Sequence, residues 1–343
     1  MSRPYAANRE PVYDTLVDQA QRHQLKSSWK NSADAHTTMR SALLAAQLPD
    51  DVLTVVVSGS MGRMEVVVGS DCDLIVILSD SAIADAEVAA DCYSQVATAI
   101  QPAGLATSKP GGVFSTPNSF SRICDQVTLG IIDEDMTTFG QRIQLLIDSQ
   151  PIYGDQQCAR LQSAILARYA YQTIEYDASK QWTYLLNELI RYHRSLCVRT
   201  QWQTRNTPTK WRTLNLKLAH SRMVNYAGLL LLLGECSTQK RDKQQWLFDR
   251  LALTPLERVC HVLNNHGHDP TAVVDCYNRF LSSMNDTAFL ESLADGPDTG
   301  QPDDHPGYCE LRTSARAITT TLANFLLDRP AGWDEQFIQL MLL

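Results

Sequence analysis

Residues 55–78 read VVVSGSMGRMEVVVGSDCDLIVIL, and this segment decides the fold. It opens inside the run Val52–Val57, whose β-branched residues are typical of a strand buried on both faces. The run leads directly into Gly59 and Ser60. Glycine permits a tight turn and a close approach of backbone to ligand, and serine can cap a helix or offer a hydroxyl to a phosphate. We therefore expect a strand, a turn and the start of a helix, whose free N–H groups would favour an anion.

Two carboxylates follow the turn, at Asp71 and Asp73. If Asp71 begins a second strand, residues i and i+2 share one face, about 6.6 Å apart along it. The apolar residues 74–78 then continue both faces of that strand. Two acids at the mouth of a buried strand repel one another unless a divalent cation neutralises them. Mg²⁺ prefers such oxygen ligands and leaves room for substrate phosphates, so the pair predicts a Mg²⁺ site. The alternative is an edge strand with two solvated acids.

The rest of the chain divides into a part with strands and a part with helices. A third strand is expected at Val127–Ile132, and the stretch 101–121 reads as a loop. This segregation predicts an α+β domain at 1–155, with a mixed sheet and flanking helices, and an all-helical domain at 156–343. The boundary is expected near Pro151–Asp155, where Gly154 can stop a helix. The expected helices are 11–24, a second one following an N-cap at Ser32 and running to 47, 83–100, 136–149, 156–172, 178–199, 212–233, 243–265, 270–284, 309–327 and 333–342.

Composition narrows the classes of function. Of 343 residues, 44% are apolar and 20% charged, a globular composition that can bury a core, and the net charge of −8 argues against binding long nucleic acids. The nine cysteines contain no CxxC pair, so free thiols in a reducing cytoplasm are expected. Residues 1–10 lack the apolar core of a signal peptide, and the longest apolar run, Leu229–Leu233, is too short to span a bilayer. We therefore expect a cytoplasmic protein without a membrane partner.

A Gly-Ser turn, ten intervening residues and an Asp-x-Asp strand resemble the DNA polymerase β-like nucleotidyltransferase superfamily. The motif Gly-Ser-x-Gly-Arg-x-Glu is most similar to that of the branch that contains protein uridylyl- and adenylyltransferases and related nucleotidyltransferases. The resemblance implies two-metal catalysis with Mg²⁺ and an NTP as substrate. It implies that Gly59 and Ser60 hold the triphosphate and that Asp71 and Asp73 bind metal. For Arg63, a nucleotide contact and a structural ion pair with Glu65 both stay open.

The superfamily often has a third carboxylate on a later strand, which acts on the acceptor hydroxyl. We expect this role for Asp133, because it would close the strand at 127–132. The alternative is that the acidic residues here cap the next helix, since acids are favoured in a first helical turn. The other candidates are Asp125, Glu134 and Asp135.

The helical half offers a Lys and a Ser one turn apart, Lys217 and Ser221. Superfamily members often supply such a pair to the triphosphate, so the resemblance implies that both contact phosphate. Arg212 and Arg222 add positive charge beside them. The competing interpretation is an exposed, solvated helix face.

The sequence thus predicts a Mg²⁺-dependent nucleotidyltransferase. It would move a nucleoside monophosphate from ATP or another NTP to an acceptor hydroxyl, with a protein side chain as one candidate acceptor, and release pyrophosphate. A second hypothesis is a regulatory module that senses a nucleotide without chemistry. A third keeps the enzyme but takes a small molecule or a nucleic-acid end as the acceptor.

Overall fold

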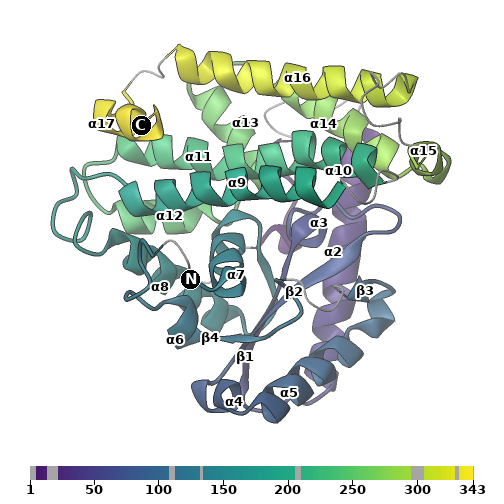
Figure 1. Ribbon diagram of the computed structural model, residues 1–343, viewed down its shortest axis with the longest axis vertical. Helices are drawn as coiled ribbons and strands as arrows, with labels where there is room; N and C mark the ends of the chain where they lie inside the picture. The colour runs from purple at the N-terminus through teal and green to yellow at the C-terminus, as the bar shows by residue number, and fades with distance from the viewer. Residues whose placement is uncertain are drawn as a thin grey trace.

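The computed structural model describes residues 5–13, 22–107, 113–131, 134–204, 210–294, 305–328 and 332–342. A small sheet with flanking helices lies at one end, and helices fill the rest (Figure 1). This confirms the α+β class with a helical C-terminal region. No helix in these ranges is long and apolar enough to cross a bilayer.

The sheet is built around two adjacent antiparallel strands, β1 (Val52–Ser58) and β2 (Asp71–Leu78). The strand order is β3-β2-β1-β5, and β4 also pairs with β2. β5 is antiparallel to β1, whereas β3 and β4 are parallel to β2, so the sheet is mixed as expected. The short strands are β3 (Ala106–Thr107), β4 (Asn118–Ser119) and β5 (Gln150–Tyr153).

The expected strand at 127–132 is wrong over its described residues, 127–131. This segment runs as successive turns, and the Val127 side chain is 82% exposed. β-Branched residues favour a strand only where a neighbouring strand or a core covers them, and here nothing does. The sheet is completed instead by β5. That strand contains Pro151, which lacks an N–H and is tolerated because β5 lies at the sheet edge. Gly154 then begins a helix rather than ending one, since it is the N-cap of α8.

The N-terminal helices also differ from expectation. A single helix, α2 (His23–Ala45), runs through Ser32, which is buried and donates its hydroxyl to the Ser28 carbonyl rather than capping a helix. The expected helix at 11–24 falls largely on residues 14–21, outside the described ranges. The Ser32 hydroxyl finds its hydrogen-bond partner in the preceding helical turn. A serine in the sequence therefore did not indicate the start of a helix here.

Several expected helices are divided in the structure. The 83–100 segment is α4 (Asp80–Ala84) and α5 (Ala86–Ala99), because the Asp85 side chain caps α5. The 243–265 segment is α12 (Lys243–Arg250) and α13 (Pro255–Asn265), separated at a capping box of Thr254 and Glu257. The 212–233 segment is α10 (Trp211–Lys217), a π-helical turn η4 (Leu218–Arg222) and α11 (Met223–Ser237). The remaining helical elements are η1 (Ala6–Asn8), α3 (Gly59–Gly62), η2 (Gln101–Ala103), α6 (Phe120–Ile123), α7 (Met136–Ile147), α8 (Asp155–Ala170), α9 (Thr183–Thr204), α14 (Thr271–Met284), α15 (Thr287–Ser292), α16 (Pro306–Leu327) and α17 (Glu335–Leu342).

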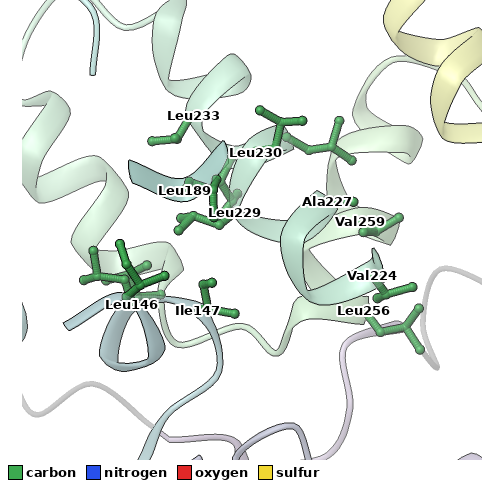
Figure 2. Packing of buried hydrophobic residues seen from close by; sticks show 14 of the residues in the cluster. Leu146, Ile147, Leu189, Val224, Ala227, Leu229, Leu230, Leu233, Leu256 and Val259 are labelled. Atoms are coloured by element: carbon green, nitrogen blue, oxygen red, sulfur yellow. The ribbon is translucent and has the colours of Figure 1, made fainter. Parts of the chain in front are cut away.

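Each face of β2 packs against a different hydrophobic cluster. Leu74 and Val76 belong to the cluster that α2 and α5 cover. Ile75 and Ile77 belong to the large cluster that extends without a break into the helices. The centre of this large cluster is α11, whose leucines lie among side chains of α7, α9 and α13 (Figure 2). One apolar core therefore joins the sheet to the helical half, and the division of domains at 155 stays a prediction.

Candidate active site

The Gly-Ser turn is held in a conformation that glycine accommodates best. β1 ends at Ser58, and α3 forms a single turn beginning at Gly59, which has φ +65°. A Cβ on Gly62 would collide with the backbone carbonyl of Asp148, which leaves no room for another residue. Because α3 is so short, the N–H groups available to an anion are those of a tight turn rather than of a regular helix.

The two carboxylates lie at the start of β2 on one face. β2 begins at Asp71, as predicted, and Asp73 is paired across the sheet with Ser58. Cys72 points to the opposite face and packs against Met39. A Cβ built on Gly59 would stand only 2.5 Å from Oδ2 of Asp73. The missing side chain of the turn therefore makes the space that this carboxylate occupies.

Two cations of the helical half lie near the carboxylates of β2. Lys217 interacts electrostatically with Asp71 and Asp73, and Arg222 interacts with Asp73 and with Tyr192 of α9. The Lys217 side chain keeps an exposed surface, although surrounding protein atoms desolvate its ammonium group enough to lower its pKa. Desolvation also lowers the pKa of Arg222. In the described part of the chain neither cation forms an ion pair with a carboxylate.

The π-helical turn explains why both cations face the acids. In a π-helix the hydrogen bonds run from residue i to i+5, so residues five apart lie nearer to one face than they do in an α-helix. In an α-helix the same spacing would put them on different faces. Lys217 precedes η4 and Arg222 ends it, five residues later. Arg222 is further fixed by donating from Nη1 to Thr200 Oγ1 of α9 at 2.8 Å.

The structure shows which carboxylates Arg63 contacts. Its Nε lies 2.8 Å from Oε2 of Glu65, and its Nη1 lies 2.8 Å from Oδ2 of Asp148. Both carboxylates are almost fully buried. Desolvation alone would lower the pKa of Arg63, but the charges of Glu65 and Asp148 outweigh it and raise that pKa. Arg63 thus forms structural ion pairs next to the turn, and its nucleotide contact stays a prediction.

Ser60 and Ser221 have different surroundings. Ser60 remains half-buried within the turn. Ser221 is buried, and its side chain lies beside the Tyr277 hydroxyl of α14. Its contact with phosphate stays a prediction.

The candidates for a third carboxylate have structural partners where they are described. Asp135 is the N-cap of α7 and accepts from the Thr138 N–H at 2.8 Å, as the capping interpretation expects. Glu134 is buried and paired with Arg142 at 2.5 Å. Asp125 accepts from the Val127 N–H within a turn. Asp133 lies outside the described residues, so its role stays a prediction.

Sequence reasoning missed Asp148, which lies between α7 and β5. Its Oδ1 is 2.6 Å from the Ser58 hydroxyl, and its Oδ2 also accepts from Asn225 Nδ2 at 2.9 Å. No local pattern indicates this residue, since its partners come from β1, the turn and α11. Tyr192, which contacts Gln144 of α7 through its hydroxyl, was missed for the same reason.

Comparison with known families agrees with this geometry. Residues 9–124 match the model of the family described as "Putative nucleotidyltransferase DUF294". No curated protein matches the chain. The matched segment contains the Gly-Ser turn and the Asp-x-Asp strand and ends before the helices that carry Lys217 and Arg222. A family of this description supports nucleotidyl transfer as the general activity, with a nucleotide as substrate. The match confirms, over residues 9–124, the nucleotidyltransferase resemblance that the turn and the strand predicted.

Proposed function

We propose that the protein transfers a nucleoside monophosphate from a Mg²⁺-bound NTP to an acceptor hydroxyl and releases pyrophosphate. The observation that carries the proposal is that two carboxylates and two cations lie near one another at the Gly-Ser turn. Asp71 and Asp73 begin β2 beside the Gly-Ser turn. From the helical half, Lys217 lies close enough to interact electrostatically with both acids, and Arg222 with Asp73. Acids for a metal and cations for phosphates are the two requirements of this chemistry.

The carboxylate pair fits a magnesium ion. The described residues contain no group of three or more His, Cys, Asp or Glu side chains that could hold a metal by itself. Mg²⁺ does not need one, because it is commonly bound by one or two carboxylates together with waters and substrate phosphates. Asp71 and Asp73 would be those ligands, and their alternation with Cys72 keeps both on the side of the turn. When bound, the ion would neutralise the triphosphate and favour attack by the acceptor oxygen.

The protein's own groups would bind and orient the triphosphate. Gly59 and Ser60 present a backbone turn that phosphate oxygens can approach closely. Lys217 and Arg222 would contact phosphate oxygens from the opposite side, where charge-assisted hydrogen bonds are strong. Surrounding protein atoms partly desolvate both cations, so each gives up less hydration when it binds an anion.

In the reaction, the acceptor oxygen forms a bond to the α-phosphorus while the bond between that phosphorus and the bridging oxygen of pyrophosphate breaks. The proton of the acceptor hydroxyl must pass to a base, and Asp133 stays our candidate for it. We place acceptor recognition in the helical half, which lies next to the end of the sheet that carries α3 (Figure 1). A protein hydroxyl is the acceptor class that we would test first.

The test is thermal unfolding with each of the four NTPs, with and without Mg²⁺. A ligand that binds only the folded state raises the unfolding midpoint by mass action. We expect a Mg²⁺-dependent rise with at least one NTP, and its loss in Asp71→Asn with Asp73→Asn. A control with Asp34→Asn and Asp91→Asn removes the same charge from exposed positions and should keep the rise.

Labelled nucleotide then separates the hypotheses. Incorporation of label into an acceptor, absent from the double Asn variant, supports transfer. Binding without any turnover would instead favour the nucleotide-sensing module. The absence of a Mg²⁺-dependent shift with every NTP would refute the proposed site.

A further inference from the structure

Two buried carboxylates connect the Gly-Ser turn to the helical half through Arg63. Arg63 follows α3 directly and bonds Glu65 and Asp148 with separate nitrogens, each at 2.8 Å. Its side chain is 12% exposed, and those of Glu65 and Asp148 are 4% and 0% exposed. The three residues therefore form a charged cluster inside the protein, directly beneath the turn.

Each carboxylate extends this cluster to a different helix. Glu65 accepts from the Tyr277 hydroxyl of α14 at 2.8 Å, and the Ser221 side chain of η4 lies beside that hydroxyl. Asp148 accepts from the amide of Asn225 in α11 at 2.9 Å. Ser221 and Asn225 are four residues apart and lie on either side of Arg222 in sequence. The cluster thus holds the helical segment that carries the two cations, and both cations lie near enough to Arg63 to interact with it electrostatically.

The buried hydrogen bonds between the cluster and these helices resist helix movement more strongly than apolar packing would. Apolar contacts permit small sliding and rotation of a helix at low cost, whereas a buried hydrogen bond that breaks leaves an unsatisfied polar group. Buried ion pairs add little to stability compared with well-packed apolar residues, but they can fix one arrangement of elements. A rotation of this helical segment would break the bond between Asn225 and Asp148, would separate Ser221 from Tyr277 and would move Lys217 relative to the acids.

We propose that Arg63, Glu65, Asp148 and Tyr277 form an interlock that sets the position of Lys217 and Arg222 opposite Asp71 and Asp73. The inference rests on the proposed function and extends it. The four residues are positioning residues, because they act through the π-helical turn rather than on the nucleotide. Tyr277 is the most remote of them, 212 residues from its partner Glu65.

The test uses Tyr277→Phe in the full-length protein, which removes one hydroxyl and keeps the ring. The matched control is Tyr169→Phe. Tyr169 is equally buried and is likewise hydrogen-bonded to a buried glutamate, Glu188, which lies near arginines. Both variants lose the same kind of bond, but only Tyr277 belongs to the interlock. Two quantities are measured, the amide hydrogen exchange of residues 215–225 without nucleotide and the affinity for Mg²⁺–NTP.

We expect Tyr277→Phe to speed exchange at 215–225 and to weaken Mg²⁺–NTP affinity, each by about tenfold relative to Tyr169→Phe. Equal exchange and equal affinity in the two variants would overturn the interlock. If Tyr277→Phe does not fold, Asn225→Ala removes the bond between Asp148 and α11 and is measured against the same control. Should the wild-type protein bind no NTP, the proposed function fails, and the exchange data still decide whether Tyr277 holds η4.

Discussion

Gly59→Ala perturbs the site at a defined contact. Gly59 has φ +65°, and a Cβ at this position would lie 2.5 Å from Oδ2 of Asp73. Real carbon–oxygen contacts begin above about 3.0 Å, so the carboxylate must retreat by about half an ångström or more. The methyl group therefore displaces one of the two proposed metal ligands without changing its chemical type.

The two consequences of this substitution differ in size. The left-handed backbone costs about 1–2 kcal/mol once a Cβ is present. A misplacement approaching 1 Å in a reacting site can cost on the order of 100-fold in rate. We therefore expect a stability loss of about 1–2 kcal/mol together with a loss of about 100-fold in Mg²⁺-dependent transfer.

Gly267→Ala is the matched control, because Gly267 has φ +74° and no atom lies within 4 Å of the place that its new methyl group would take. It carries the same backbone cost but displaces nothing. Urea unfolding gives the stability of both variants, and incorporation of labelled nucleotide gives the transfer rate. If Gly59→Ala transferred nucleotide at the wild-type rate, or if both variants lost transfer equally, the metal-binding role proposed for Asp73 beside Gly59 would be refuted.

The remaining predictions concern charge and pH. Lys217→Ala and Arg222→Ala should each weaken Mg²⁺–NTP affinity about tenfold, because each removes one cation that faces the acids; unchanged affinity in calorimetric titration would remove that residue from the site. Burial lowers the pKa of both His36 and His220 to about 4, against about 6.5 in an unfolded chain. Between pH 6.5 and 4 the unfolded chain thus binds more protons than the folded protein. The free energy of unfolding should therefore decrease as the pH is lowered from 6.5 to 4. The loss should approach about 3 kcal/mol for each imidazole, and urea unfolding at pH 7 and pH 4.5 measures it against His→Gln variants. Asp148→Asn should lower the free energy of unfolding by about 3 kcal/mol or more, since a buried guanidinium loses a countercharge; a loss below about 1 kcal/mol would contradict the buried pairing.

The sequence by itself determined the two central strands, the turn between them and the side on which the acids lie. These features are local. A β-branched run, a Gly-Ser turn and the alternation of Asp71, Cys72 and Asp73 each depend on neighbours a few residues away. The resemblance implied a phosphate contact for Lys217, which stays a prediction, and in the structure Lys217 lies close enough to Asp71 and Asp73 to interact with them electrostatically.

Only the tertiary structure decided which strand lies beside β1 and which distant residues bind the side chains around the turn. β5 contains a proline and gives no strand pattern, yet it fills the edge beside β1, while the strand-like segment 127–131 finds no partner and remains in turns. Arg63 finds Asp148 across 85 residues. Tyr277 finds Glu65 across 212 residues. Such contacts are fixed by the packing of whole elements, and no short sequence pattern records them, because the free energy that favours each one appears only when both partners are buried together.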